Sequence, residues 1–386
     1  MIAHLITRLC MGGAQQVALG IANNSPELGK KNLFITGLSN EERSDAPNNY
    51  LLQEVNKELK LEIIPDLNDK ISLKNDFISL LKIFKILRKN KPELLHIHSS
   101  KTGVLGRLAC IFLNTKVIFH VHGWSFSRSS DFKSKIYFFI EWLLYFFTDH
   151  FIFVCNQDRI DFKKKGNLKN LNSKSSVIYP GAKFIDLENF KRAKLHIRKS
   201  LSIDSQDIVV GNIARLDHQK DPELFVNIAK EIILKSDKKF KFVLIGSGLL
   251  EEKVKNMVED LGIKDHFVFT GYIENVEHYF SIFDAFLITS KYEGLPVTAL
   301  KAISCNSLIF GYKINGMKDL KNLFSTVFLV ESRNPKIMAD LILSKFQKYY
   351  LLKGNLESSS RKVRKEFNVD NMYNKIYSLY KNLIQK

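Results

Sequence analysis

The chain has 386 residues, of which 45% are hydrophobic and 25% charged, so it has enough apolar material for two domain cores and an intrinsically disordered chain is excluded. The 58 Lys and Arg residues exceed the 40 Asp and Glu residues and give a formal net charge of +18. This balance favours an anionic partner, either nucleic acid, an anionic membrane surface or a phosphate-bearing substrate, although a coding bias towards lysine would produce the same excess.

The first half of the chain alternates between apolar strand patterns and helical periodicity. Strands are predicted at 1–7, 32–37, 61–64, 94–98, 117–121 and 151–154. Helices are predicted at 14–23, 76–89, 101–113 and 132–147. Regular alternation of this kind indicates a parallel, doubly wound sheet.

The pattern loosens between residues 177 and 207, and the turn signal Tyr179-Pro180-Gly181 places a domain boundary at Gly181. Strands then resume at 208–214, 240–245, 267–270, 285–289 and 307–310. A helix is expected to open at Asp221-Pro222, with Asp221 as its N-cap. We therefore predict two α/β domains, 1–181 and 182–369, and an amphipathic closing helix within 370–386 that packs back on the first domain.

Cysteine usage and the apolar segments bear on the cellular compartment. The four cysteines show neither zinc nor disulfide spacing, so we expect buried, reduced thiols in a cytoplasmic protein; they are Cys10, Cys110, Cys155 and Cys305. No signal peptide is predicted. The apolar stretch 137–147 contains Glu141 and is shorter than the ~20 residues that span a bilayer, which favours a core helix over an interfacial membrane helix.

Chemistry-bearing residues follow the predicted strands of the second domain, where open parallel sheets bind ligands. Arg215 and Lys220 come between a strand and the start of a helix, an arrangement suited to a diphosphate, although two solvated surface charges would fit the same pattern. Glu293 precedes Gly294-Leu295-Pro296 and another helix. Its carboxylate is expected either to accept hydrogen bonds from sugar hydroxyls or simply to cap that helix.

Two glycine turns and a pair of histidine motifs complete the candidates. Gly246-Ser247-Gly248 and Gly12-Gly13 each follow a strand and permit close backbone approach to a ligand, or serve only as tight turns. His122 ends a strand in HVHG and is a candidate to polarise a substrate group. His96 and His98 are interpreted as structural, and no further ligands at metal-binding spacing are evident, so no metal is expected.

Taken in order, the segments HIHSSKTGVLGRLA, VHGWSF, ARLDHQK, LIGSG, FTGY and KYEGLPVTALKA resemble the retaining glycosyltransferases of family 4. The resemblance spans nearly the whole chain, and ARLDHQKD and SKYEGLP are its most specific parts. It implies the GT-B fold, in which two Rossmann-like domains face each other across a cleft. The SSKTGVLGR and HVHGWSF segments are similar to a subgroup that builds capsule, exopolysaccharide or O-antigen units on a polyprenyl-diphosphate lipid.

The resemblance also implies roles for individual residues. Arg215 and Lys220 would hold the donor diphosphate, and Glu293 would bind the donor sugar beside the backbone of Gly294 and Leu295. His122 would lie near the reacting centre. The remaining donor-binding candidates are Gly12, Gly13, Gly246, Ser247, Gly248 and Tyr272.

Lys301 departs from the family pattern, because the family has a second glutamate eight residues after the first. That carboxylate accepts hydrogen bonds from the ribose hydroxyls, whereas a lysine only donates. We expect altered nucleotide binding. Activity is still favoured, because Arg215, Lys220 and Glu293 are all present.

The expected reaction is transfer of a hexose or N-acetylhexosamine, with retention, from a UDP-linked nucleotide sugar to a polyprenyl-diphosphate-linked saccharide or other glycan. No cofactor or metal is expected. The protein is expected in the cytoplasm, attached peripherally to the anionic inner face of the cytoplasmic membrane, and no nucleic-acid-binding module is recognised. The alternatives are a nucleotide-sugar epimerase of related fold and a non-catalytic subunit of a polysaccharide assembly complex.

Overall fold

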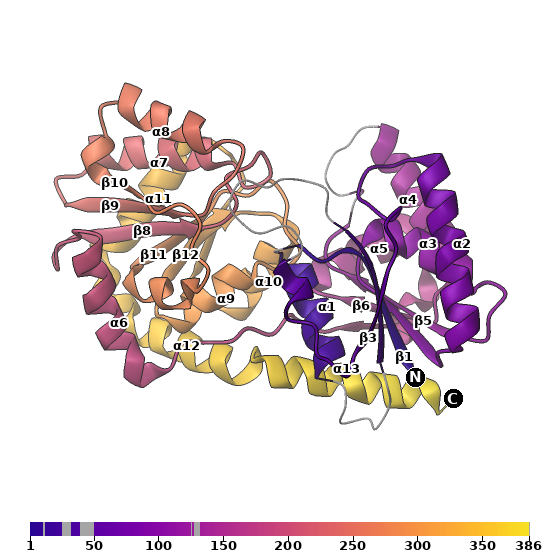
Figure 1. Ribbon diagram of the computed structural model, residues 1–386. Helices are drawn as coiled ribbons and strands as arrows, with labels where there is room; N and C mark the ends of the chain where they lie inside the picture. Colours follow the sequence, from indigo (N-terminus) through magenta and orange to yellow (C-terminus); the bar gives the residue numbers. More distant parts are fainter. Residues whose placement is uncertain (11, 25–31, 39–49, 125, 127–131, 386) are drawn as a thin grey trace. The chain divides into compact units, whose positions relative to one another are not determined.

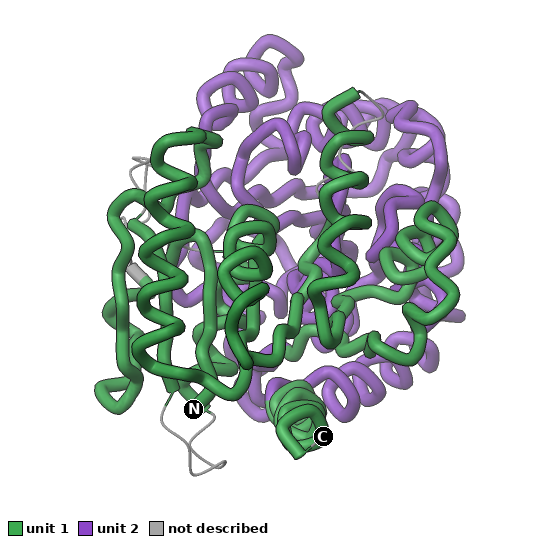
Figure 2. Tube along the Cα trace, turned by 90° about the vertical axis from the view of Figure 1, so that its right-hand side faces the viewer, with its two compact units in different colours: residues 1–181, 370–386 green, residues 182–369 purple. Residues whose placement is uncertain are grey.

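The computed structural model describes residues 1–10, 12–24, 32–38, 50–124, 126 and 132–385. Ser125 of the HVHGWSF segment and the last residue of the chain therefore lie outside the described part. Internal contacts divide the chain into two compact units, Met1–Gly181 with Asp370–Lys386, and Ala182–Val369 (Figure 2). Each unit is built around one parallel sheet.

Unit 1 contains a seven-stranded sheet in the order β3-β2-β1-β4-β5-β6-β7. Its strands are β1 (Ile2–Arg8), β2 (Asn32–Gly37), β3 (Lys60–Ile63), β4 (Leu94–Ile97), β5 (Lys116–Val121), β6 (His150–Phe153) and β7 (Ser175–Val177). Its helices are α1 (Gly13–Asn23), α2 (Leu73–Asn90), α3 (Ser100–Cys110), α4 (Phe132–Leu144), α5 (Asn156–Gly166) and α13 (Val369–Ile384). The order reverses beside β1, which makes the β1/β4 boundary the switch point where such sheets bind ligands.

Alternation along the strands sends side chains to two different cores in unit 1. Helices α2, α3 and α5 contribute to a core with Leu5, Leu95 and Phe119 on one face of the sheet. On the other face, α1 and α13 pack on Ile2 and Leu94 together with their neighbours in the sheet. The closing helix α13 thus completes unit 1 although it follows unit 2 in the chain (Figure 2).

Unit 2 repeats the topology with six strands in the order β10-β9-β8-β11-β12-β13. The strands are β8 (Ile208–Ile213), β9 (Phe240–Ile245), β10 (Phe267–Phe269), β11 (Ala285–Ile288), β12 (Leu308–Tyr312) and β13 (Val327–Val330). The helices are α6 (Leu187–Ser200), α7 (Pro222–Lys235), α8 (Glu251–Asp260), α9 (Val297–Ser304), α10 (Asn315–Leu323), α11 (Pro335–Gln347) and α12 (Lys353–Glu366). Helices cover both faces of the sheet (Figure 1), and the switch point falls between β8 and β11.

The predicted α/β alternation is confirmed, and several local expectations are corrected. The segment where the pattern loosens forms helix α6, whose residues are mainly polar or charged and leave only a narrow apolar stripe. Helix α3 ends at Cys110 and α4 at Leu144, each three residues before the expected end, and the 3₁₀ turn Tyr145–Phe147 follows α4. The four cysteines are buried and free. Among the described residues no helix is long and apolar enough to span a bilayer.

Candidate functional site

The loops that follow β8 and β11 lie side by side, because these two strands are parallel neighbours in the unit 2 sheet. Gln219 connects them: its backbone carbonyl accepts the Lys291 N–H at 2.8 Å, and its side-chain amide donates to the Tyr292 carbonyl at 3.1 Å. The Thr289 hydroxyl donates to the Lys220 carbonyl at 2.7 Å. The two loops therefore form one rigid surface at the carboxyl ends of the strands.

Lys220 and Glu293 form an ion pair on this surface. The ammonium group of Lys220 contacts Glu293 Oε1, and the Ser290 hydroxyl donates to the same oxygen at 2.7 Å. Only 22% of the Lys220 side chain and 12% of the Glu293 side chain are exposed, so water screens the pair weakly. The structure thus brings these two predicted residues together although 73 positions separate them.

Arg215 lies at the exposed end of the same loop. Its side chain is 44% exposed and pairs with Asp217 at 2.7 Å, while a second nitrogen donates to Gln219 at 3.4 Å. Asp217 Oδ1 also accepts the backbone N–H groups of Gln219 and Lys220, both at 3.0 Å. Sequence reasoning missed Asp217 and Gln219, which hold the loop that carries both cations.

The loop 246–248 after β9 packs against the Arg215 segment. The Leu216 N–H donates to the Ser247 carbonyl at 2.9 Å, and the Leu250 N–H donates to the Leu216 carbonyl at 2.9 Å. Gly246 and Gly248 have φ of 128° and 154°, a region that side chains rarely adopt. A Cβ on Gly246 would meet the Ala214 carbonyl oxygen at 2.0 Å. The glycine at 246 is therefore required by the backbone itself.

We expect Gly246→Ala to destabilise unit 2 by about 2–3 kcal/mol, because strain at a positive φ adds to a clash with backbone that cannot move freely. The matched control is Gly354→Ala, since a Cβ there meets nothing within 4 Å. Urea unfolding followed by far-UV circular dichroism measures the difference. Equal unfolding midpoints for the two variants would contradict the assignment.

Two local expectations near this site are wrong. Asp221 precedes α7 but does not cap it; its φ of 51° turns the carboxylate towards Arg333, which it meets at 2.8 Å. Pro296 lies at the N-cap position of α9, one residue before the first turn in which it was expected. Pro222 does begin α7 as predicted. Arg333 also donates hydrogen bonds to the carbonyls of Thr289 and Ser290, and these bonds hold the loop that follows β11 in place.

Gly294 and Leu295 are fixed by the start of α10. A Cβ on Gly316 would meet the Gly294 carbonyl oxygen at 1.4 Å, so this backbone approach needs glycine at position 316. Leu295 is only 6% exposed. Tyr272 is half-buried just after Gly271, whose carbonyl accepts the Gly246 N–H at 2.8 Å. All these predicted donor-site positions therefore belong to neighbouring strand-end loops of unit 2.

Lys301 has a partner of its own, Glu277, at 2.7 Å. Burial pushes the pKa of Glu277 upwards, but the hydrogen bond and charge of Lys301 outweigh it and leave that pKa lowered. The pair therefore stabilises unit 2 at pH values above the pKa that Glu277 has in the unfolded chain. This contribution is lost as the pH falls through the lower pKa of Glu277 in the folded chain. Sequence reasoning identified Lys301 but missed Glu277.

Replacing Lys301 with glutamate is expected to lower the stability of unit 2 by about 1 kcal/mol at pH 8, because two carboxylates then share one half-buried position. A like charge raises the pKa of Glu277, so stability should recover as the pH falls towards 5. Lys301→Met is the control, since it removes the pair without adding repulsion. Loss of stability in Lys301→Glu that is the same at pH 8 and pH 5 would refute this interpretation.

The predicted residues of unit 1 lie at the ends of its strands. Gly12 has extended backbone and precedes α1, whose first residue is Gly13. His122 follows β5 and is half-buried. Burial lowers the pKa of His122 to about 3, so the ring is neutral at physiological pH.

Two units with the strand order of nucleotide-binding sheets define the class of protein. The fold matches the Anabaena protein HepE in complex with UDP and glucose, with a TM-score of 0.78 and 16% identity over 98% of this chain and 99% of that one. It also matches sucrose-phosphate synthase from Thermosynechococcus elongatus, with a TM-score of 0.80 and 15% identity over 100% and 99% of the two chains. This is the GT-B fold of glycosyltransferases.

Sequence comparisons identify the family. Residues 11–184 match Glycosyltransferase Family 4, and residues 193–358 match Glycosyl transferases group 1. An Escherichia coli UDP-Gal:alpha-D-GlcNAc-diphosphoundecaprenol alpha-1,3-galactosyltransferase is 32% identical over 86% of this chain and 84% of its own length. The Escherichia coli O-antigen biosynthesis glycosyltransferase WbnH is 26% identical over 59% of this chain and 60% of its own. The chain belongs to the family 4 glycosyltransferases.

Proposed function

We propose that the protein transfers a hexose or N-acetylhexosamine from a UDP-linked sugar to a polyprenyl-diphosphate-linked saccharide in surface polysaccharide synthesis. The observation that carries the proposal is the Lys220–Glu293 pair beside Arg215, at the switch point of the unit 2 sheet. A pyrophosphate needs cations, and a sugar needs a carboxylate acceptor. The name of the Escherichia coli relative, a UDP-Gal:alpha-D-GlcNAc-diphosphoundecaprenol alpha-1,3-galactosyltransferase, supports these donor and acceptor classes.

In this proposal, Arg215 and Lys220 bind the diphosphate, and the start of α7 adds its dipole. Glu293 Oε1 already takes the contacts from Lys220 and Ser290, so Oε2 is the oxygen that accepts a hydrogen bond from the donor sugar. The loop 246–248 offers backbone approach to the nucleotide. Unit 1 presents the acceptor.

The proposed reaction proceeds with retention. The bond between the anomeric carbon and the phosphate oxygen breaks, and the acceptor oxygen forms the new bond on the same face. The acceptor proton passes to the departing phosphate, whose charge Arg215 and Lys220 stabilise. In this proposal the two cations supply the positive charge that the departing phosphate needs, and no metal ion takes part at the donor.

A transfer assay tests this function. Purified protein, a panel of UDP sugars and a GlcNAc-diphosphate lipid are combined in the presence of EDTA, and the product is examined by mass spectrometry and by NMR of the new anomeric centre. We expect transfer from one UDP sugar with the α configuration kept. Conversion of the donor without acceptor would identify an epimerase, and no donor binding at all would favour the non-catalytic subunit.

Attachment to an anionic membrane surface is the second part of the proposal, and α4 carries it. Glu141 on its buried face pairs with Arg107 of α3 at 2.6 Å, which fixes how the helix is turned. Its outer face exposes Phe132 by 75% and Phe139 by 59%, and Phe146 of the next turn is 62% exposed. Spacing of seven residues places these rings on one stripe. A stripe of three exposed aromatic rings on one helix face is typical of membrane contact.

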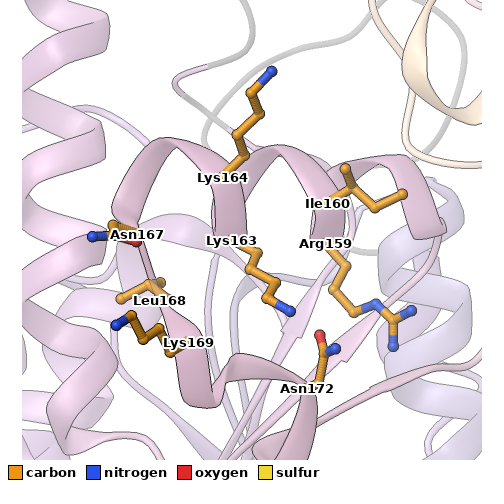
Figure 3. A pocket seen from close by; sticks show the side chains of 8 residues that line it. All are labelled: Arg159, Ile160, Lys163, Lys164, Asn167, Leu168, Lys169 and Asn172. Atoms are coloured by element: carbon orange, nitrogen blue, oxygen red, sulfur yellow. The ribbon is translucent and has the colours of Figure 1, made fainter.

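Positive charge adjoins this stripe. Helix α5 packs on α4 through Phe162 and Phe138, whose ring centroids are 6.2 Å apart. A pocket of about 530 Å³ beside α5 contains four cations and no acidic side chain in its lining (Figure 3). It is lined by Arg159, Ile160, Lys163, Lys164, Asn167, Leu168, Lys169 and Asn172. These cations support binding to anionic lipid headgroups.

Phe139→Glu combined with Phe146→Glu is expected to reduce sedimentation with phosphatidylglycerol vesicles at least tenfold, because both substitutions place charge in the contact. The control is Leu234→Glu combined with Leu249→Glu, since these leucines are 69% and 88% exposed on unit 2. Equal sedimentation of the two double variants would exclude α4 as the contact.

A further inference from the structure

Five histidines form one polar layer on the sheet face of unit 1 that α1 and α13 cover. The strands β1, β4 and β5 are neighbours in the sheet, and His4 of β1 is the register partner of His96 of β4. On the other side of β4, His96 pairs with Ile118 of β5, and His120 lies two residues further along that strand. Period-two alternation places His98 and His122 on the same face. The rings are in contact: centroids are 4.0 Å apart for His96 and His98, and 4.2 Å for His120 and His122.

This layer contains ring nitrogens that have no hydrogen-bond partner in the described part of the chain. They are His4 Nε2, His96 Nε2, His98 Nδ1, both nitrogens of His120, and His122 Nε2. Each unpaired buried polar group costs about 1–3 kcal/mol, so such a set needs a physical explanation. A bound ligand that accepts imidazole lone pairs would supply it.

Three of the five histidines already use one ring nitrogen in a contact with another side chain. His4 Nδ1 lies 3.3 Å from His98 Nε2, and His96 Nδ1 contacts the Tyr380 hydroxyl of α13. His120 has both ring nitrogens uncommitted, and His98 Nδ1 and His122 Nε2 are unpaired as well. His122 is half-buried, which provides a route of entry from the surface.

The electrostatic state of these rings suits a metal ion. Burial, aided by the neighbouring imidazoles, lowers the pKa of His98 and of His120 well below the usual value, and burial lowers the pKa of His122 to about 3. All three are neutral at pH 7. Neutral imidazole is the form that binds metals, so no proton has to be displaced.

We propose that His98, His120 and His122 bind a divalent first-row transition metal of the zinc type, with water as the fourth ligand. One nitrogen from each ring lies within 4.8 Å of the others. Nitrogens on one tetrahedral zinc ion are about 3.4 Å apart, since each Zn–N bond is about 2.1 Å. Rotation of the rings about χ2, which is a soft torsion, closes this difference.

The environment specifies the class of ion. Three imidazoles without a carboxylate favour zinc, cobalt, nickel or copper over magnesium and calcium, which prefer oxygen ligands. With the metal on His98 Nδ1, the opposite Nε2–H donates to His4 Nδ1. A hydrogen bond of that kind orients ligating histidines in known metal sites.

The proposed site belongs to unit 1, whereas Arg215, Lys220 and Glu293 belong to unit 2. It is therefore separate from the question of whether donor transfer needs a metal. His122 is also the candidate to polarise a substrate group, so occupancy of the site would remove it from that role and reduce transfer.

Equilibrium dialysis of the metal-free full chain against Co²⁺ and Zn²⁺ tests the proposal. We expect one ion per chain to remain after gel filtration and the visible absorption of tetrahedral, nitrogen-ligated cobalt. His120→Gln should lose this absorption and lower the affinity at least tenfold. His150→Gln is the matched control, because His150 lies in adjacent β6 and bonds to Ser176 at 2.9 Å.

Equal binding by wild type and His120→Gln, or no stoichiometric ion in the wild type, would overturn the proposal. Tryptophan fluorescence verifies that the variants fold. Should His120→Gln fail to fold, ¹⁵N NMR of the wild type decides instead: zinc must shift the ring nitrogens of three histidines together, and unchanged ring signals would reject the site.

Discussion

Replacing Arg215 with alanine is expected to lower kcat by about 10²–10³-fold. This is the typical effect of removing one preorganised group that stabilises negative charge as it develops in the transition state. The fold should be retained, because Arg215 is 44% exposed and Asp217, which loses its ion-pair partner, still accepts two backbone N–H groups at 3.0 Å. Since the guanidinium acts mainly on the departing phosphate, KM should change much less than kcat. Steady-state transfer kinetics with the preferred UDP sugar measure both constants.

Arg192→Ala is the matched control for this experiment. Arg192 is an exposed arginine on α6 of the same unit, so its loss changes the net charge equally. Arg215→Lys should fall between wild type and alanine, because a lysine keeps the charge but not the forked donor geometry. Turnover in Arg215→Ala equal to that in Arg192→Ala would remove Arg215 from the mechanism.

Acidification from pH 7.5 to pH 5 should strongly destabilise unit 1 of the metal-free protein. Burial lowers the pKa of His4 and of His122 from 6.5 to about 3, so between these values the unfolded chain binds more protons than the folded one. Stability therefore rises with pH in this window and falls on acidification. Each of these two histidines contributes about 2 kcal/mol between pH 6.5 and 5, and His96, His98 and His120 act in the same direction.

The two tryptophans of the chain, Trp124 and Trp142, both lie in unit 1. Their fluorescence in urea titrations reports on unit 1 alone, while far-UV circular dichroism reports on both units. We expect the fluorescence midpoint to fall steeply below pH 6.5 and saturating zinc to oppose the fall. A fluorescence midpoint that is constant between pH 7.5 and pH 5 would show that the histidine layer is not held neutral.

Most strands could be predicted from sequence because buried parallel strands are continuous or nearly continuous apolar runs, such as β11. The predictions failed where that signal is weak. Strand β13 has only four residues, and β7 has three with two serines. Helix α6 was missed because its polar residues conceal its periodicity.

The individual residues of the candidate site could be predicted from the sequence, but their proximity in space could not. Arg215 and Glu293 follow strands β8 and β11, which are adjacent in space although β9 and β10 lie between them in sequence. Sequence alone does not give this order. The histidine layer was missed for the same reason, since it forms only when β1, β4 and β5 pair. Two H-x-H segments, at 96–98 and 120–122, were the signal available beforehand.

Calorimetric titration with UDP and UMP tests most directly whether Arg215 and Lys220 bind the pyrophosphate of the donor. The wild type should bind UDP at least tenfold more tightly than UMP, because the second phosphate reaches both cations. The double variant Arg215→Ala with Lys220→Met should bind the two nucleotides equally. A wild type without preference for UDP, or a double variant that keeps the preference, would contradict the account.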